Sequence, residues 1–240
     1  DTFLEEEPGA GPFIKELISA KEYLNGEKRY CLWLKDADPT ILKKLPKVIE
    51  RIENVKKLRS ESTRKKTQEL AKYPSLFGEI RQPKTNYVFI PLTSSENRDY
   101  IPMSFFSPDF ITNNTASLVP NATTYHFGIL QSKMHMVWVK YTCGRLESRY
   151  RYSNNIVYNN FPWPQKVSEE RIKKVGGCAE NVIFIRTTYP HSSLADLYDP
   201  NTMPSDLREA HEKLDKAVED CYGKKFKNDQ ERISSLFELY

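Results

Sequence analysis

Charged and aromatic side chains alternate along residues 145–152, whose sequence is R-L-E-S-R-Y-R-Y. In a β-strand, successive side chains point to opposite faces. A strand here would carry two distinct sets of side chains: Arg145, Glu147, Arg149 and Arg151 on one face, and Leu146, Ser148, Tyr150 and Tyr152 on the other. A charged β-ribbon of this kind fits the major groove of DNA, where arginine and acidic side chains match the edges of the bases. The alternative is a solvent-exposed edge hairpin whose charges pair only with one another.

Glu147 and Arg149 have the most specific chemistry in this row. On one strand their side chains would start about 7 Å apart, so that both could converge on the edge of a single base pair. A carboxylate accepts a hydrogen bond from N4 of cytosine, and a guanidinium donates to O6 and N7 of guanine. We therefore predict that the two residues read one C·G pair together. The competing interpretation is an ion pair without a role in DNA binding, which would contribute little at the surface.

A second concentration of charge precedes this row. Residues 41–72 contain eleven lysines and arginines and four acidic residues, a net charge of +7, whereas the whole chain carries +4. Residues 189–240 contain seven basic and eleven acidic residues, a net charge of −4. The asymmetry indicates a basic part that faces nucleic acid and an acidic part that faces something else; the alternative is a solvated helix face. The residues predicted to contact DNA phosphates are Lys56, Lys57, Arg59, Arg64, Lys65, Lys66 and Arg145.

No catalytic or metal-binding motif accompanies these charges. The sequence contains no G-x-x-x-x-G-K-[ST] loop and no glycine-rich fingerprint after a strand, so a nucleotide-binding loop is not indicated. No Ser-His-Asp or Cys-His set stands in a recognisable local context, and the cysteines and histidines lack the spacing of zinc ligands. We therefore expect no catalytic residue and no metal site. The four cysteines are expected to be free thiols in a reducing cytoplasm: Cys31, Cys143, Cys178 and Cys221.

The first residues of the chain and its apolar runs bear on where in the cell the protein is expected. No run approaches the roughly 18 consecutive apolar residues of a membrane span, and the acidic first residues do not resemble a signal peptide. The chain begins at Asp1 without an initiator methionine. We expect a fragment or processed product that starts in a linker, residues 1–11.

Short runs of β-branched and aromatic residues predict the strands. The predicted strands are residues 30–34 (Y-C-L-W-L) and 87–92 (Y-V-F-I-P-L), with weaker signals at 101–106, 116–119, 156–158 and 182–186. Apolar residues with helical spacing over 129–142 predict a helix that Gly144 ends.

Two further helical regions follow from capping residues and apolar spacing. Asp38 opens a basic helix that Pro46 kinks or splits and that runs to about Tyr73. Near the C-terminal end, one helix begins at residues 202–204 and ends at Gly223, and Asn228 caps a last helix. We expect these acidic helices to form a small packing module.

Several ordered motifs resemble a known family. They are Y-C-L-W-L (30–34), F-G-E-I-R-Q-P-K (77–84), S-S-E (94–96), H-F-G-I-L-Q-S-K-M-H-M (126–136) and C-G-R-L-E-S-R-Y-R-Y-S-N-N-I-V-Y-N-N-F-P-W-P (143–164). These motifs resemble the target-recognition domain of the MmeI-like enzymes, single-chain Type IIL restriction–modification proteins with relatives that only methylate. The segment L-A-D-L-Y-D-P-N-T-M-P-S-D-L-R-E-A-H (194–211) resembles the helical C-terminal domain of the same family.

The resemblance implies a fold and a domain organisation. Residues 1–11 would be a linker from a missing catalytic part, residues 12–165 a DNA target-recognition domain, and residues 166–240 a helical C-terminal domain. The implied fold class is α+β, with a mixed β-sheet and a long basic helix followed by a small helical module.

The resemblance also implies cofactors, partners and further site residues. In this family a nuclease domain and an adenine-N6 methyltransferase domain come first, so S-adenosylmethionine, and Mg²⁺ if the nuclease is present, would belong to the parent and no cofactor to this fragment. The implied partners are double-stranded DNA and the methyltransferase domain of the same polypeptide, in a bacterial cytoplasm and without a membrane. Besides Glu147, Arg149 and Arg151, the resemblance implies three base-reading residues: Glu96, Asn114 and Thr115.

Two functions of different classes remain open at this point. The first is a sequence-specific recognition module for double-stranded DNA, non-catalytic by itself, from a bifunctional adenine-N6 methyltransferase and restriction endonuclease. The second is an assembly domain that packs on the methyltransferase domain and contacts DNA only non-specifically. The salt dependence of DNA affinity separates them, because contacts to phosphates give a steep log–log slope.

Overall fold

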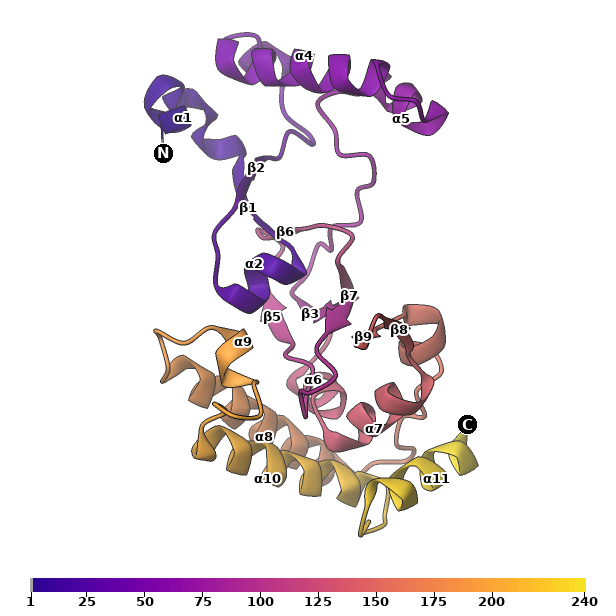
Figure 1. Ribbon diagram of the computed structural model, residues 1–240. Helices are drawn as coiled ribbons and strands as arrows, with labels where there is room; N and C mark the ends of the chain where they lie inside the picture. Colours follow the sequence, from indigo (N-terminus) through magenta and orange to yellow (C-terminus); the bar gives the residue numbers. More distant parts are fainter. Residues whose placement is uncertain (1) are drawn as a thin grey trace. The chain divides into compact units, whose positions relative to one another are not determined.

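The computed structural model describes residues 2–240, which form two compact units (Figure 1). The first unit contains the residues up to Leu17, Arg29–Gln82 and Asp109–Ile111, and the second contains Ile18–Lys28, Pro83–Pro108 and Thr112–Tyr240. Helices and short antiparallel sheets occur together, so the predicted α+β class is confirmed. Among residues 2–240, no helix is both long enough and apolar enough to cross a membrane.

The first unit consists of short elements and one long helix. In chain order they are α1 Thr2–Glu6, the 3₁₀ helix η1 Pro8–Phe13, β1 Ile14–Ile18, β2 Tyr30–Leu32, α3 Pro39–Leu42, α4 Pro46–Ser60, α5 Lys65–Glu69, the 3₁₀ helix η2 Leu70–Lys72 and β6 Ile111–Thr112. The strands form one sheet in the order β2-β1-β6, and β1 pairs with β2 in an antiparallel register that sets Ile14 opposite Leu32. The strand predicted at residues 30–34 is present as β2 but is shortened to Tyr30–Leu32.

Pro46 splits the predicted basic helix rather than kinking it. Proline fits the first turn of α4 because its missing N–H is one that a helix start leaves unpaired. Leu45 has no side chain that can cap the helix, and the Glu7 carboxylate instead accepts a hydrogen bond from the backbone N–H of Lys47 at 2.8 Å. The small core of this unit is formed by Ala10, Leu34, Leu42, Leu45 and Val48.

Two predictions for this unit are wrong. Residues 2–11 are not a linker, because α1 and η1 fold onto the core and Ala10 is fully buried; Asp1 lies outside the described residues. The basic helix does not reach Tyr73, because α4 ends at Ser60. The Ser60 hydroxyl donates to a backbone carbonyl of the preceding turn, and the serines and threonine of residues 60–63 compete for the groups that would continue the helix.

The second unit holds two small sheets and most of the helices. In chain order its elements are α2 Ala20–Asn25, β3 Tyr87–Pro91, β4 Thr93–Ser94, β5 Ser104–Phe106, β7 Ala116–Pro120, α6 Thr124–Leu130, α7 Lys133–Thr142, β8 Gly144–Leu146, β9 Arg149–Arg151, the π-helical turn η3 Asn154–Tyr158, α8 Glu169–Thr187, α9 Leu194–Leu197, α10 Ser205–Cys221 and α11 Asp229–Leu239. Strand β3 is buried along its whole length between β5 and β7. The strands predicted at residues 87–92 and 116–119 are present, and the one at 101–106 is shortened to β5.

Leu92 joins the sheet around β3 to the sheet that contains β8 and β9. Its N–H donates to the Thr115 carbonyl at 2.9 Å, which continues the ladder between β3 and β7, and its carbonyl accepts from the N–H of Tyr152 at 2.8 Å. Strand β4 then pairs with β9, in the sheet order β4-β9-β8. Leu92 and the pairing of β4 with β9 therefore connect the β8–β9 hairpin to the end of the central strand.

The C-terminal helices pack against α6 and α7 in one hydrophobic core. Helices α8 and α10 lie side by side (Figure 1). The strand predicted at residues 182–186 is wrong, because this β-branched run is the last part of α8, in which Val175, Ala179 and Val182 are buried with helical spacing. The predicted end of α10 is confirmed, with Gly223 in the left-handed conformation after it, as is the cap of α11 by the side chain of Asn228.

Two further elements differ from their predictions. The helix expected over 129–142 is divided into α6 and α7, because the Gln131 side chain bonds to backbone groups just before β5 and Ser132 caps a new helix. Gly144 does not end α7 but begins β8. Residues 156–158 belong to η3 rather than to a strand, and the carbonyl of buried Val157 accepts a hydrogen bond from an indole N–H of α7.

Arg186 is a buried cation at the centre of the polar contacts of the second unit. Its guanidinium donates to Gln131 Oε1 at 2.9 Å, to the Met103 carbonyl and to the Tyr198 hydroxyl. The Tyr198 hydroxyl lies 2.8 Å from Nε2 of His211, so it accepts from the cation and has its own proton to donate to the ring. These contacts tie α8, α9 and α10 to the segment that precedes β5.

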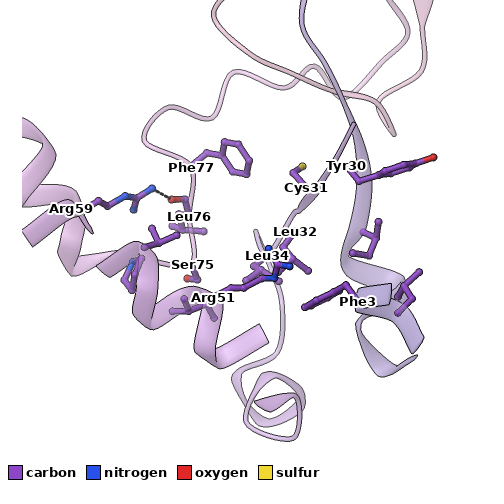
Figure 2. A pocket seen from close by; sticks show the side chains of 15 residues that line it. Phe3, Tyr30, Cys31, Leu32, Leu34, Arg51, Arg59, Ser75, Leu76 and Phe77 are labelled. Carbon is purple, nitrogen blue, oxygen red and sulfur yellow. Dashed lines mark hydrogen bonds between the residues drawn. The ribbon is translucent and has the colours of Figure 1, made fainter. Parts of the chain in front are cut away.

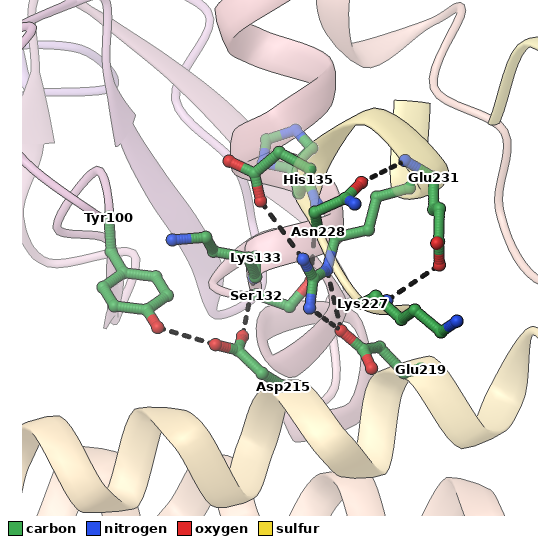
Figure 3. Close-up of polar contacts among 11 residues, drawn as sticks. Tyr100, Ser132, Lys133, His135, Asp215, Glu219, Lys227, Asn228 and Glu231 are labelled. Carbon is green, nitrogen blue, oxygen red and sulfur yellow. Dashed lines mark hydrogen bonds and ion pairs between the residues drawn. The ribbon is translucent and has the colours of Figure 1, made fainter. Parts of the chain in front are cut away.

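Asp215 anchors a neighbouring part of α10 through polar contacts (Figure 3). Its carboxylate accepts hydrogen bonds from the Tyr100 hydroxyl and from the backbone N–H of Lys133, both at 2.6 Å. Burial raises the pKa of Asp215 to about 6. The Tyr100 ring stacks on His211 with centroids 4.1 Å apart, and burial holds the pKa of His211 well below its usual value.

Replacing Arg186 with methionine is expected to lower the free energy of unfolding by about 2–4 kcal/mol, because it leaves the Met103 carbonyl and the Gln131 amide oxygen buried without this donor. Urea denaturation measures the loss. Arg171→Met, on the exposed face of the same helix, is the matched control and should change the stability by less than about 0.5 kcal/mol. Equal effects of the two substitutions would contradict a central role for Arg186.

Stability is expected to fall as the pH drops from about 6.5 towards 4. Burial lowers the pKa of His135 to about 4 from its usual 6.5, and that of His211 is also lowered, so in this window the unfolded chain binds more protons than the folded one. The raised pKa of Asp215 works in the opposite direction between 3.8 and about 6, and the two histidines outweigh it. His135→Gln should flatten the slope of unfolding free energy against pH by up to about 1.4 kcal/mol per pH unit. An unchanged slope would contradict this account.

Candidate nucleic-acid interface

Residues 145–152 form a tight hairpin rather than the single strand predicted. Strand β8 pairs antiparallel with β9 in a register that sets Arg145 opposite Tyr150 and Leu146 opposite Arg149. Residues 147 and 148 alone connect the strands, and Glu147 lies in the left-handed region with φ +58°. For an L-residue other than glycine this conformation costs roughly 1–2 kcal/mol, so neighbouring contacts must hold the turn.

The hairpin keeps part of the predicted alternation and reverses the rest. In β9 and the residue after it, Tyr150 and Tyr152 are buried, with exposed fractions of 4% and 2%, while Arg149 and Arg151 face solvent. This half of the prediction is confirmed. Residues opposite each other in a ladder share a face, so Leu146 joins the arginine face and is 44% exposed. Arg145 joins the tyrosine face, which reverses its predicted position.

Glu147 and Arg149 come together although they do not lie on one strand. The turn folds the Glu147 carboxylate back to Arg149, where its Oε2 accepts from Nη2 at 2.6 Å. Both side chains remain substantially exposed, at 76% and 45%. Such a pair contributes little to stability, and it leaves further donors and acceptors of both groups open at the tip of the hairpin.

Glu96 lies beside the same turn. The Ser148 side chain is the largest cause of the lowered pKa of Glu96, and the positive charges of Arg145 and Arg149 lower this pKa further. The Tyr150 hydroxyl lies 3.4 Å from the Glu96 carbonyl oxygen. The structure therefore brings together Glu96 and the pair of Glu147 and Arg149, which the sequence placed in separate segments.

Asn114 and Thr115 lie just before β7, on the ladder that Leu92 continues. The Thr115 hydroxyl accepts from the backbone N–H of Ala20 at 2.8 Å and donates to the side chain of Asn113 at 2.6 Å. Because both hydrogen bonds are made within the protein, the Thr115 hydroxyl serves to hold the loop in place. The Asn114 side chain is exposed and can meet a ligand.

Helix α7 supports the hairpin from behind. The Tyr152 hydroxyl lies 3.1 Å from Nε2 of His135, which is completely buried. The ring of Phe161 packs edge-on against His135 with centroids 5.0 Å apart. Arg145 covers the exposed side of Tyr150, with its guanidinium carbon 4.2 Å from the ring centroid. The charged side chains of the hairpin are thus supported by buried aromatic rings.

Most of the predicted phosphate-contacting residues lie in the first unit. Lys56, Lys57, Arg64, Lys65 and Lys66 are exposed on α4, α5 and the turn between them. The ammonium group of Lys56 lies 3.8 Å from an oxygen of Glu53. Arg59 differs from the others, because its guanidinium donates to the carbonyls of Leu70, Tyr73 and Leu76 at 3.0, 2.8 and 2.8 Å. Its contacts make Arg59 a brace between α4 and the segment that follows η2.

Two of these features have no local signal in the sequence. The turn at residues 147–148 contains no glycine, asparagine or proline, the residues by which hairpin turns are recognised. The bracing role of Arg59 depends on the chain folding back after α4, which local patterns do not encode.

The first unit also contains an apolar groove of about 640 Å³ (Figure 2). It is lined chiefly by aliphatic and aromatic side chains: Phe3, Leu4, Ile14, Tyr30, Leu32, Leu34, Ile52, Val55, Leu76 and Phe77. Arg51 lies at its edge with the guanidinium carbon 4.5 Å from the Phe3 ring centroid. Tyr30 is 54% exposed. The groove is an apolar surface that a protein segment can cover.

Within residues 2–240, no three histidine, cysteine or acidic side chains lie close enough together to hold a metal ion. The four cysteines are free thiols. The second unit gathers exposed polar and charged groups, and the histidines and the carboxylate whose pKa values shift most, His135, His211 and Asp215, are buried in packing contacts. What these exposed groups can do is form hydrogen bonds with a ligand that carries both donors and acceptors.

Comparison with known proteins gives matches along the whole chain. Residues 1–165 match the MmeI target recognition domain family, and residues 167–240 match the MmeI C-terminal domain family. DNA methyltransferase A of Bacillus subtilis (strain 168) is 41% identical over 234 residues, which are 97% of this chain and 26% of that protein.

A solved structure is similar over the full chain. It is the Type IIL restriction–modification enzyme MmeI in complex with DNA, with 43% identity and a TM-score of 0.95 over 100% of this chain and 32% of that one. The chain thus spans between a quarter and a third of the length of these two relatives. The resemblance seen in the sequence motifs is confirmed. The chain belongs to the MmeI family and contains the target recognition domain and the C-terminal domain of that family.

Proposed function

We propose that this chain is the part of a bacterial, cytoplasmic DNA-modifying enzyme that recognises a specific sequence in double-stranded DNA. The single observation that carries the proposal is the β8–β9 hairpin, which exposes Glu147 at its turn and Arg149 and Arg151 along β9, while Tyr150 and Tyr152 are buried. Membership of the MmeI family supports it, as does the solved structure of the relative MmeI, which is a complex with DNA. A two-stranded ribbon is narrow enough to enter the major groove.

The pair of Glu147 and Arg149 suits one C·G base pair. The carboxylate can accept from N4 of cytosine while the guanidinium donates to O6 and N7 of guanine. The 2.6 Å contact places the two side chains next to each other in the absence of DNA. Arg151, Glu96 and Asn114 are proposed to read neighbouring base pairs. Thr115 is proposed to shape their loop, because its hydroxyl is occupied by Ala20 and Asn113.

The chemistry of modification is proposed to lie outside this chain. The longer relatives include a DNA methyltransferase and a restriction–modification enzyme. The parent polypeptide is accordingly proposed to transfer a methyl group from S-adenosylmethionine to N6 of adenine, and to use Mg²⁺ where it also cleaves. This chain is proposed to bind no cofactor and to position the target for the methyltransferase domain of the same polypeptide.

The apolar groove favours a second candidate function, that of an assembly surface. Its aliphatic and aromatic walls suit a segment of the methyltransferase domain better than they suit a phosphate backbone. Assembly and DNA recognition are compatible in one chain. The two functions are distinguished by measuring DNA affinity as a function of salt concentration. Recognition gives a preferred DNA sequence and a steep slope of log affinity against log salt. Assembly alone gives no preferred sequence, and altering the hairpin then leaves DNA affinity unchanged.

Selection of duplexes from a randomised library on the 240-residue chain tests the proposed function. We expect one target sequence to emerge. The double variant Glu147→Lys, Arg149→Asp is then expected to prefer G·C over C·G at a single position, because lysine donates to guanine and aspartate accepts from cytosine with the polarity reversed. Either single substitution should cost about 1–3 kcal/mol of binding to the original target.

The matched control is Lys21→Glu, Glu27→Lys, which reverses another exposed ion pair of the second unit. It should leave the selected target unchanged. If the hairpin double variant keeps the original preference at every position, Glu147 and Arg149 do not read bases.

Neutralising Lys65 and Lys66 together is expected to weaken binding to all duplexes about equally. The slope of log affinity against log salt should flatten by about one per lost phosphate contact. Arg59→Gln should instead lower the thermal stability of the chain, because it removes a donor to three backbone carbonyls. A change of sequence preference in the lysine variant, with an unchanged slope, would contradict a role in phosphate contact.

A further inference from the structure

Arg145 lies on the opposite face of the hairpin from the arginines that are proposed to read DNA. It pairs across the ladder with Tyr150, and its guanidinium carbon lies 4.2 Å from the centroid of that ring. This separation is well within the range of a cation–π contact. A guanidinium held over this buried ring lies on the face of the hairpin that packs on the domain.

The same guanidinium connects the turn to the end of a helix. Its Nη1 lies 3.3 Å from the Ser148 carbonyl oxygen, and its Nη2 lies 3.4 Å from that of Lys140 in the last turn of α7. Both hydrogen bonds are long, and the contact with the Tyr150 ring helps to keep the guanidinium that donates them in place. The carbonyls of a last helical turn have no partner within the helix and favour a cation.

Ser148 lies close to a second group as well. Its side chain lowers the pKa of the Glu96 carboxyl group, so the two side chains are near each other. The carbonyl of Ser148 is therefore held by Arg145, and its side chain lies beside Glu96. Its neighbour Glu147 has the left-handed backbone that needs such support.

We propose that Arg145 is a positioning residue for base recognition, which braces the turn carrying Glu147 and thereby sets the discrimination made by Glu147 and Arg149. Arg145 does not touch DNA in this arrangement. The inference rests on the proposed function and deepens it. It replaces the prediction from the sequence that Arg145 contacts a phosphate.

Arg145→Lys separates bracing from phosphate contact. Lysine keeps the positive charge and can bind a phosphate. Its single ammonium group cannot, however, contact the Tyr150 ring and donate to two carbonyls at once as the guanidinium does. In binding of the 240-residue chain to its selected duplex, we expect this variant to lose about tenfold of its discrimination at the base pair of Glu147 and Arg149. Discrimination at the other positions, the salt slope and the melting temperature should stay the same.

Two further variants complete the experiment. Ser148→Ala, which removes the hydroxyl beside Glu96, is expected to give the same selective loss at the same position. Arg171→Lys, an exposed arginine on α8, is the matched control and should change none of the measured quantities.

The proposal is overturned if Arg145→Lys behaves as the unaltered chain while Arg145→Met weakens all duplexes equally and flattens the salt slope by about one, because Arg145 is then a phosphate ligand. It is also overturned if both substitutions leave discrimination unchanged. Failure of the unaltered chain to select any target is a separate result, which contradicts the proposed function and this inference together.

Discussion

The burial of Tyr150 and Tyr152 is the constraint on which the arrangement of the interface depends. Because side chains in a strand alternate, fixing these two rings in the core fixes Arg149 and Arg151 on the outer face. A shift of one residue in the register of β9 would bury two guanidinium groups and expose two aromatic rings. The hydrogen bond from Tyr152 N–H to Leu92 adds a second restraint on the same register. The core of the domain therefore determines which side chains the hairpin presents.

The interior of the second unit supports this hairpin through polar contacts as well as packing. His135 of α7 meets Tyr152, and Arg186 of α8 binds Gln131, which lies between α6 and α7. The C-terminal helices thus share one core with the helix on which the hairpin stands. In this arrangement the helical C-terminal segment is part of the support for the interface. Its net acidic character suits that position, since acidic side chains would be repelled by a phosphate backbone.

The sequence predicted the features that depend on local spacing and missed those that depend on distant contacts. The alternation over residues 149–152, the strand at 87–92 and the cap at Asn228 follow from neighbouring residues, and the structure contains all of them. The turn at 147–148 was missed because Glu147 adopts a left-handed backbone that its residue type does not favour. Residues 182–186 have the composition of a strand, but their packing in the core makes them helical. Family resemblance placed Glu96 beside the site, whereas only the structure showed its contact with Ser148.

The central claim is that the tip of the β8–β9 hairpin reads a guanine in the major groove of duplex DNA. Replacement of each guanine of the selected target by 7-deazaguanine, one at a time, tests it most directly, because this removes the N7 acceptor and leaves Watson–Crick pairing intact. The account predicts that one such replacement weakens binding by the unaltered chain about tenfold and has no further effect on Arg149→Ala. If every replacement is without effect, or if the sensitive guanine remains sensitive in Arg149→Ala, the hairpin does not read that base and the account is contradicted.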